Sequence, residues 1–241
     1  AQFNYLLPLN MESLYGADGA EIFGLLTSVN GFIVIIATPL VTTFAARIMD
    51  VRKIALGTVL SLIKVYEAPY GGSVTLLSMA PMILLSLRRG VKGGLPAAFV
   101  YSVLQLILGL SSVAWVPSIG GKFWCIILDY ILAFTVLGLG GIFRNVRFSK
   151  NETTNLFVSA ILGALLATVL RFICHILSGA VIWYALDLEW YADDPDHIVH
   201  KYGAWMFSTI YNGTFMLPEI IETVIGVPLL TKALSKVNMN Q

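Results

Sequence analysis

Residues 153–186 read "TTNLFVSAILGALLATVLRFICHILSGAVIWYAL", a run with no acidic side chain and only two basic ones, Arg171 and His175. About 20 apolar residues in a helix cross a bilayer core of ~30 Å, so this run is long enough to span a membrane. A membrane-spanning β-strand would alternate apolar and polar residues over about ten positions, and this run does not. It predicts a transmembrane helix that carries two basic side chains in its interior.

The composition extends this prediction to the whole chain. Of its 241 residues, 57% are hydrophobic and 12% are charged, and the mean hydropathy is +0.81. Soluble domains carry about 25% charged residues, so we expect a protein embedded in the lipid bilayer. Further runs with few ionisable residues cover 22–46, 54–63, 74–87, 93–121, 123–143 and 202–231. The predicted fold class is an all-α integral membrane protein.

Two segments of different character follow each other along the chain. From Lys53 onward the pattern predicts a six-helix bundle, with spans at about 53–66, 74–87, 93–111, 123–143, 155–185 and 204–233. Residues 1–52 hold a polar start, one long apolar helix and a basic turn, and they resemble a single segment of a major facilitator superfamily transporter. We predict an appended transmembrane segment over 1–52 and a bundle domain over 53–241. Because the chain begins at Ala1 rather than Met, we expect a fragment or a processed chain.

Charge is distributed unequally between alternate ends of the spans. The connections at 47–53, 88–92 and 144–152 and the tail after residue 231 are rich in Lys and Arg and hold only two acids. The positive-inside rule places these ends, and the C-terminus, in the cytoplasm of a multi-pass cell-membrane protein. The N-terminus would then lie outside if the appended helix inserts. The opposite ends carry acids, which include Asp187, Glu189, Asp193, Asp194 and Asp196. These outer acids either concentrate a cationic solute or are simply what the rule leaves outside, and the charge pattern alone favours the second reading.

The two basic residues of the opening run belong to a stripe with a four-residue spacing, which consists of Arg171, His175, Gly179 and Trp183. At 100° per residue this spacing stays near one helix face. An ionisable group at the bilayer centre costs about 2.5 to 3.5 kcal/mol, so it faces the bundle interior and marks a ligand site or an ion pair. We interpret Arg171 as the partner of a buried acid and His175 as a ligand-binding residue. Gly179 would leave room for a flat ring beside Trp183, although a Trp near a helix end also fits the interfacial belt.

Two other spans carry polar residues at the same depth. In "LDYILAF", residues 128–134, Asp129 and Tyr130 lie in an apolar helix, where a carboxylate needs a partner or water. Asp129 could bind a ligand amine or pair with Arg171, and we favour the ligand. In "YNGTFMLPEIIETV", residues 211–224, Tyr211 and Asn212 open the last span, and the amide of Asn212 suits the edge of a heterocycle.

Deeper in the last span, Pro218 is expected to break the helix ladder, and Glu219 or Glu222 is the expected partner of Arg171. The connection at 66–76, "YEAPYGGSVTL", contains Gly71 and Gly72 and could be a mobile lid over a pocket, but composition alone favours a plain hairpin connection.

Enzyme chemistry receives little support from motifs. There is no HExxH, GxSxG or Walker A pattern, and no spacing typical of a metal site. His197 and His200 lie in an acidic loop, where a solvated loop is favoured over a weak metal site. We therefore expect no enzyme activity, no metal, no cofactor and no nucleic-acid partner. The alternatives left open are an intramembrane enzyme that uses His175 and Asp129 as acid and base, and a truncated secondary transporter.

Four motifs together resemble one known family. They are the stretch from Ile54 to Gly90, "LDYILAFTVLGLGGIF" at 128–143, "RFICHILSGAVIW" at 171–183 and "YNGTFMLPE" at 211–219. Over about residues 54–234 the chain resembles the thiamine-specific S component of energy-coupling factor transporters, the ThiT family. The resemblance implies a six-helix protein that captures thiamine from outside with high affinity. Transport would need a coupling protein and two ATPase subunits from other chains. An S component for another vitamin or heterocycle is the nearest alternative.

The resemblance also implies a set of ligand-binding residues. Asp129 matches an acid that contacts the aminopyrimidine, and Asn212 matches an amide that reads the same ring. The remaining implied pocket residues are Tyr130, His175, Gly179, Trp183, Phe207, Tyr211 and, in the first outer loop, Gly72. Phe207 departs from the family, which has a hydrogen-bonding aromatic side chain there; Tyr211 could replace the lost hydroxyl.

A second departure concerns the first helix of the bundle. S components commonly dock on the coupling protein through small residues spaced by four, which allow two helices to approach closely. The position four before Ala55 is Val51 here, and Gly57 with Ser61 is the substitute pair that we expect.

Overall fold

The computed structural model describes residues 51–68 and 72–238. The predicted appended segment therefore lies outside the described residues, apart from its last two positions. Within the described ranges the elements, in chain order, are α3 Val51–Leu62, β1 Lys64–Glu67, β2 Ser73–Thr75, α4 Ala80–Arg89, α5 Val91–Leu108, α6 Leu110–Ala114, α7 Ile119–Cys125, the π-helix η2 Ile126–Leu132, α8 Ala133–Thr135, the 3-10 helix η3 Val136–Gly141, α9 Glu152–Ser178, the π-helix η4 Gly179–Trp183, α10 Tyr184–Trp190, α11 Ile198–Lys201 and α12 Ala204–Asn238.

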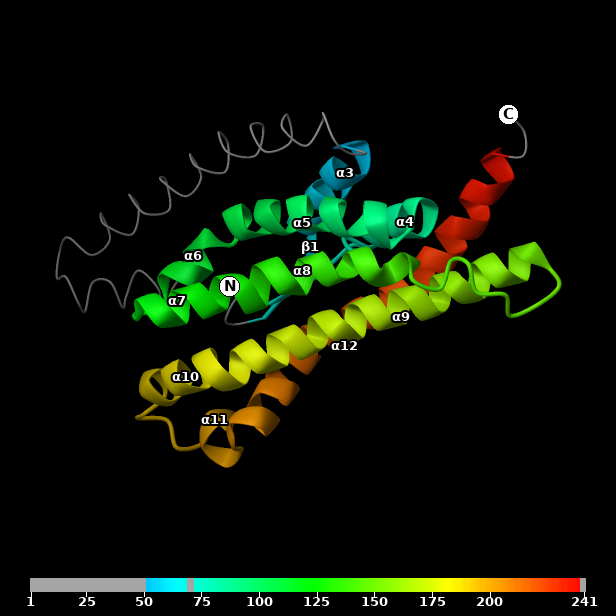
Figure 1. Ribbon diagram of the computed structural model, residues 1–241. Helices are drawn as coiled ribbons and strands as arrows, with labels where there is room; N and C mark the ends of the chain where they lie inside the picture. The colour runs from blue at the N-terminus through cyan, green and yellow to red at the C-terminus, as the bar shows by residue number, and fades with distance from the viewer. Residues whose placement is uncertain (1–50, 69–71, 239–241) are drawn as a thin grey trace.

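The long helices lie side by side in an elongated bundle (Figure 1). By length and composition, four helical stretches of the described residues can cross a membrane: Val91–Leu108, Ile119–Gly141, Glu152–Trp190 and Ala204–Ala233. The all-α membrane fold is thereby confirmed. α3 and α4 have 12 and 10 residues, which is short for a span of about 20 residues, so the number of six spans stays a prediction.

An apolar stripe on the outside of the bundle explains how it sits in lipid. Five exposed side chains follow one face of α9 and η4 at a spacing of four: Leu165, Val169, Ile173, Leu177 and Val181. A second exposed apolar row on α12 consists of Leu217, Ile221, Ile225 and Leu229. Soluble proteins rarely expose contiguous apolar surface of this kind. These rows are the lipid-facing surfaces of the two longest helices, and the polar stripe of α9 faces inward.

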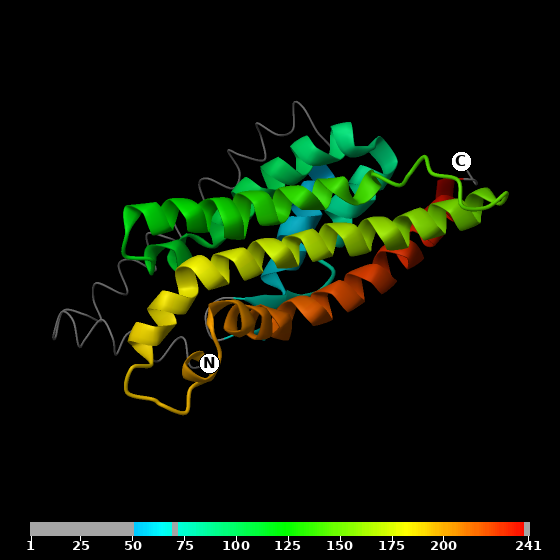
Figure 2. The ribbon, with the colours of Figure 1, turned by 60° about the horizontal axis from the view of Figure 1, so that its bottom comes forward.

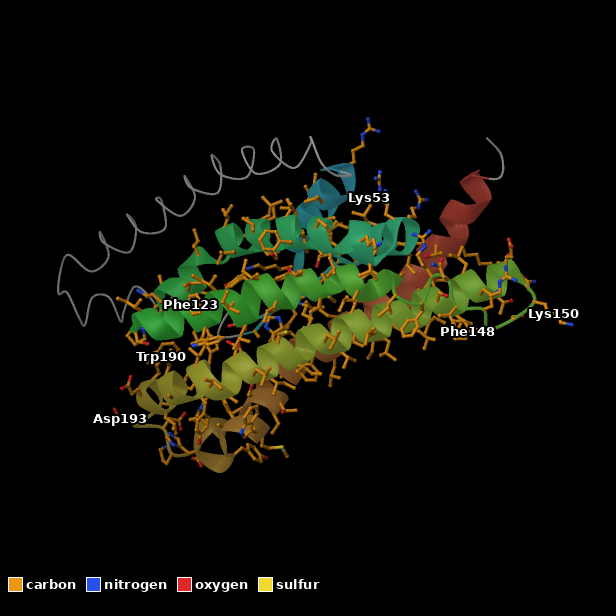
Figure 3. All side chains as sticks on the ribbon, viewed as in Figure 1. Lys53, Phe123, Phe148, Lys150, Trp190 and Asp193 are labelled. Atoms are coloured by element: carbon orange, nitrogen blue, oxygen red, sulfur yellow. The ribbon has the colours of Figure 1, made fainter. Side chains whose placement is uncertain are left out.

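The two ends of the bundle differ in charge. Lys150 marks what we call the basic end, which also holds Arg88, Arg89, Lys92, Arg144 and Arg147. Asp193 lies at the other end of the molecule, the acidic end, with Glu189, Asp194 and Asp196 nearby in the chain (Figure 3). α9 runs from the basic to the acidic end, and α12 returns beside it (Figure 2).

Close backbone contacts hold the basic half together. A Cβ on Gly163 of α9 would lie 1.9 Å from the carbonyl oxygen of Gly140 in η3, so no other residue fits there. A Cβ on Gly141 would lie 2.1 Å from the Ser86 carbonyl oxygen of α4. The Ser86 hydroxyl also donates to the Gly138 carbonyl oxygen and accepts from the Gly141 amide, at 2.5 and 2.9 Å. Helices that approach this closely gain dispersion contacts and hydrogen bonds, which are the main sources of helix association in lipid.

Three details differ from expectation. The first predicted span, 53–66, ends early, because α3 stops at Leu62 and Lys64–Glu67 pairs as β1 with β2 in an antiparallel hairpin. α12 continues as an α-helix through Pro218, because neighbouring groups in a packed helix accommodate the missing N–H.

The third difference concerns the substitute docking pair on α3. Gly57 is buried, and a Cβ there would lie 3.2 Å from the Ser78 carbonyl oxygen; Ser61 accepts a hydrogen bond of 2.9 Å from Gln105. Both residues face into the bundle, so the prediction that they form an outward docking pair is wrong. The exposed face of α3 instead carries Leu56 and Val59.

Candidate functional site

A cavity of about 410 Å³ lies among the hairpin of β1 and β2, α5, η2, η4 and α12. Pockets for small molecules have volumes of about 300 to 1,000 Å³. All nine side chains or backbone positions named from the sequence line this one cavity: Gly72, Asp129, Tyr130, His175, Gly179, Trp183, Phe207, Tyr211 and Asn212. The structure therefore brings together residues that are up to 140 positions apart in the chain.

Two π-helical segments place the polar residues of the cavity. η2 contains Asp129 and Tyr130, and η4 begins at Gly179 and ends at Trp183. Four residues of α-helix turn by about 400°, so a stripe spaced by four drifts by about 40° at each step. A π-turn is wider and turns less per residue, and such turns occur frequently at functional sites. η4 thus returns Trp183 toward the face that carries His175, which periodicity in an ideal helix would not do.

Asp129 is the centre of a hydrogen-bond cluster. Its Oδ2 accepts from the Ser178 hydroxyl at 2.5 Å and from the Trp183 indole Nε1 at 3.0 Å. Its Oδ1 accepts from His175 Nδ1 at 3.0 Å. Hydrogen bonds to a carboxylate are stronger than those between neutral groups, so the cluster can hold a charge in an apolar bundle. Oδ1 has a single protein donor and keeps a lone pair for a further one.

His175 links this carboxylate to the deeper Arg171. Arg171 Nε lies 3.3 Å from His175 Nε2 and donates to it, which leaves the proton of a neutral imidazole on Nδ1. That proton is the one donated to Asp129. Arg171 also lies over the ring of Phe134, with 4.3 Å between Cζ and the ring centroid. A cation above an aromatic face is attracted to it, and this holds the guanidinium in place.

The acid opposite Arg171 is Glu219. Arg171 Nη1 and Glu219 Oε2 are 3.9 Å apart, and both side chains are buried. This pair agrees with the expectation of an acidic partner on the last span. Asp129, the other candidate partner of Arg171, contacts His175 instead. Glu219 Oε1 accepts hydrogen bonds from both the backbone amide and the hydroxyl of Thr75. A polar chain therefore runs from Asp129 to the hairpin strand β2.

Glu222, the second candidate partner of Arg171, binds the backbone just after β2 instead. Its Oε1 accepts a 2.9 Å hydrogen bond from the backbone amide of Leu77. Thr75 and Leu77 are thus both anchored to α12 by carboxylates. These anchors fix the base of the hairpin beside the cavity.

Asn212 lines the cavity and uses one side of its amide to bind neighbouring groups. Its Nδ2 donates to the carbonyl oxygens of Ser208 and His175, at 2.9 and 3.2 Å. In the part of the chain that the structure describes, its Oδ1 accepts no hydrogen bond. The space over Gly179 is taken by α12, because a Cβ there would lie 2.2 Å from Ser208 Oγ and 2.9 Å from Asn212 Nδ2. Gly179 thus lets the two helices approach, in place of the open gap that we expected.

Aromatic rings form the wall that α12 gives to the cavity. Phe207 and Tyr211 are stacked with centroids 6.2 Å apart, and Tyr211 meets Phe215 edge-on at the same distance. Phe215 contacts His175 edge-on at 5.8 Å, and a Cβ on Gly72 would lie 2.2 Å from its ring. Gly72 therefore brings the hairpin directly onto this wall.

Tyr130 closes the opposite side. Its hydroxyl donates to the Gly109 carbonyl oxygen at 2.9 Å, and a Cβ on Gly109 would strike its ring. The ring is thereby fixed at the junction of α5 and α6.

Sequence reasoning missed several residues of the site. Phe215 and Ser208 line the cavity, and Ser178 donates to Asp129. None of the three gave a signal, since an aromatic or a hydroxyl in an apolar helix is common. Asp187 also lines the cavity. It continues the four-residue spacing one step beyond Trp183, which was a usable signal, but it was grouped with the outer acids.

The loop histidines are not among the residues that line this cavity. The His197 ring stacks on Tyr191 with 3.7 Å between centroids, and His200 Nε2 lies 2.7 Å from the Tyr191 carbonyl oxygen. Partial burial lowers the pKa of His197, against the opposing influence of Asp194. Over the described ranges, no group of three or more His, Cys, Asp or Glu side chains could hold a metal ion.

Known proteins resemble this chain over most of its length. Residues 52–239 match the family described as Thiamine transporter protein (Thia_YuaJ). The chain is 32% identical to Thiamine transporter ThiT of Bacillus subtilis over 194 residues, which are 79% of this chain and 86% of that protein. It is 28% identical to Thiamine transporter ThiT of Lacticaseibacillus paracasei over 158 residues, which are 63% of this chain and 70% of that protein.

A solved structure has the same fold. ThiT from Listeria monocytogenes superposes with a TM-score of 0.58 at 24% identity, and the match covers 76% of this chain and 91% of that one. The family match covers more than half of the chain, and the Bacillus relative exceeds 30% identity over most of its own length. The chain belongs to the Thia_YuaJ family of thiamine transporter proteins and is a transporter rather than an enzyme.

Proposed function

We propose that this protein is a high-affinity thiamine-binding S component of an energy-coupling factor importer. It takes thiamine from the acidic end of the bundle into the cavity around Asp129. The observation that carries the proposal is the cavity itself, in which a buried carboxylate, an open amide oxygen and several aromatic rings converge. Membership of a thiamine transporter family supports the identity of the ligand.

The acceptors of the cavity suit an aminopyrimidine. Asp129 Oδ1 retains a lone pair beside its bond from His175. Asn212 lines the cavity, and its Oδ1 accepts no hydrogen bond from the described residues. An exocyclic amine has two N–H donors, so it can donate to one or both of these oxygens. Because a carboxylate strengthens such a bond, Asp129 is expected to contribute more affinity than Asn212.

The aromatic walls suit a cationic ring. Thiamine carries a permanent positive charge on its thiazolium, and an aromatic face attracts such a cation by about 0.5 to 2 kcal/mol. Trp183 and Tyr211 line the cavity, and the indole of Trp183 is oriented by its bond to Asp129. Tyr211 also supplies a phenol one turn from Phe207, where the family hydroxyl is missing.

Transport requires other chains in this proposal. A coupling protein and two ATPase subunits drive the inward step, and the basic end faces the cytoplasm of the cell membrane. Residues 53–241 form the S-component domain, and residues 1–52 are an appended transmembrane segment. The exposed α3 face with Leu56 and Val59 is available for close contact with a membrane partner.

Titration of the purified protein with thiamine, followed by tryptophan fluorescence, tests the proposal. Quenching that saturates at submicromolar thiamine is expected, and it should be largely lost in Trp183→Phe. No quenching at micromolar thiamine, checked by calorimetry, would contradict the proposed function. Competition by another heterocyclic vitamin at lower concentration would favour the alternative of a different S-component ligand.

A further inference from the structure

Asp187 is a buried acid in the cavity wall with no side-chain partner among the described residues. It lies in α10, lines the cavity, and is only 2% exposed. Within the described part of the chain, no hydrogen bond or ion pair reaches its side chain, and its Oδ1 is a buried polar atom without a partner. Burying a carboxylate without a partner is costly, so such groups call for a binding role.

The position of Asp187 relative to the other acid of the cavity is informative. Trp183 donates to Asp129, and Asp187 follows Trp183 by four residues, about one turn or ~6 Å along the helix. Asp187 therefore lies nearer the acidic end than the Asp129 cluster. Leu186 and Ile182 pack in the apolar cluster at this end, so the carboxylate has apolar neighbours on its own helix.

The contrast between the two acids identifies what Asp187 lacks. Asp129 accepts bonds from His175, Ser178 and Trp183, so the protein itself stabilises its charge. Asp187 has none of these donors. A ligand that brings a donor or a positive charge to this end of the cavity would supply the missing interaction.

We propose that Asp187 forms a specificity-determining subsite of the cavity. It accepts a hydrogen bond from the hydroxyl group that the cationic ring of the ligand carries, and it thereby disfavours phosphate esters of that hydroxyl. This inference rests on the proposed function. In thiamine the aminopyrimidine and the hydroxyethyl-bearing thiazolium lie at opposite ends of the molecule. With the aminopyrimidine on Asp129 and Asn212, the hydroxyl end extends toward Asp187.

Phosphorylation would turn this favourable contact into a repulsive one. The ester replaces the hydroxyl donor by oxygens that only accept, and it adds about 1.5 to 2 negative charges at pH 7. A site built to bind a hydroxyl discriminates strongly against an analogue without that donor, because the buried group is then left unpaired. Asp187 in its ionised form adds like-charge repulsion to this loss.

The test compares the affinities for thiamine and thiamine monophosphate in wild type, Asp187→Asn, Asp187→Ala and Glu189→Gln, by calorimetry at pH 7 and fixed ionic strength. Glu189 is the matched control, since it lies on the same helix but is exposed. We expect wild type to prefer thiamine and Asp187→Asn to reduce this preference at least tenfold, mainly by improved binding of the monophosphate. Glu189→Gln should leave the ratio within twofold of wild type.

The outcomes separate this inference from the proposed function. If wild type binds thiamine but Asp187→Asn and Asp187→Ala both keep the wild-type ratio, the subsite is wrong and the proposed function stands. An equal change in Glu189→Gln would also overturn it, since the effect would then be one of general charge. If wild type binds neither compound, the proposed function fails and the subsite with it. Asp187→Asn should melt no lower than wild type, because no protein hydrogen bond is removed.

Discussion

The two halves of α9 have different neighbours. Toward the basic end, α9 lies so close to η3 that a Cβ on Gly163 would lie 1.9 Å from a backbone oxygen. Toward the acidic end, the same helix continues into η4 and borders a cavity of about 410 Å³. Glycine permits backbone contact in the first region. In the second, two π-turns and a set of paired polar groups keep the helices around a space. One continuous helix can therefore be a rigid packing element over one half and a binding wall over the other.

The two regions meet at the pair of Arg171 and Glu219. Below the pair, toward the basic end, the contacts are mostly apolar and backbone contacts. Above it, polar side chains connect Asp129, through His175, to the hairpin at Thr75. Replacing residues on either side should therefore affect different properties: folding on one side, and ligand binding on the other.

Gly163→Leu is expected to have the largest effect. The side chain has no space against Gly140, so α9 and η3 must separate and the basic half loses its packing. We expect no monodisperse protein after purification in detergent, as measured by size-exclusion chromatography. Leu165→Phe is the control, because Leu165 is exposed two residues away and faces lipid. Normal folding of Gly163→Leu would show that the close contact is dispensable.

Asp129→Asn comes next and should leave folding intact. The amide keeps the shape of the carboxylate but removes the charge that accepts from His175, Ser178 and Trp183. A loss of about 2.7 kcal/mol, or a hundredfold in thiamine affinity, is expected from the weaker hydrogen bonds. Asp193→Asn at the exposed acidic end should change affinity less than twofold in the same titration. Similar losses in both variants would point to the general acidic field rather than the cavity.

Asn212→Ala should weaken thiamine binding at least tenfold, or about 1.4 kcal/mol. The change removes the open Oδ1 and also the donor that holds the His175 carbonyl oxygen. Calorimetry on Thr209→Ala provides the comparison, since Thr209 is exposed and bonds only its own helix, at the Trp205 carbonyl oxygen. Unchanged affinity in Asn212→Ala would remove this residue from the proposed site.

Much of this division could be predicted from the sequence. Uncharged runs predicted the long helices, and the four-residue stripe of α9 predicted which face is polar. The acidic partner of Arg171 was narrowed to Glu219 or Glu222, because both lie deep on the last span. These features depend on local sequence and on the cost of burying charge, so a single chain reveals them.

Other features depend on packing between distant segments. η2 and η4 differ from α-helix only by a widened turn, and no residue type demands this turn. The bond between Thr75 and Glu219 joins positions 144 residues apart, so periodicity within one helix carries no information about it. The inward orientation of Gly57 likewise depends on Tyr101 of another helix. Asp187 was grouped with the outer acids because its burial is a property of the assembled bundle.

Thr75→Val is the most conservative change and should have the smallest effect. Valine keeps the shape of threonine but removes the hydroxyl that bonds Glu219, while the backbone amide of residue 75 still donates to the same oxygen. One of the two hydrogen bonds between residue 75 and Glu219 thus remains, and β2 should stay in place with more freedom to open. We expect thiamine to dissociate about two to five times faster, or ~0.4 to 1 kcal/mol, because the remaining amide bond to the Glu219 carboxylate offsets much of the loss.

Stopped-flow tryptophan fluorescence with excess competitor measures this dissociation rate. Ser73→Ala, on the same strand, is the control because no hydrogen bond within the described residues involves the Ser73 hydroxyl. If the hairpin is only a passive connection, Thr75→Val and Ser73→Ala will release thiamine at the wild-type rate. A faster release confined to Thr75→Val would show that the polar chain above Arg171 reaches the entrance of the cavity.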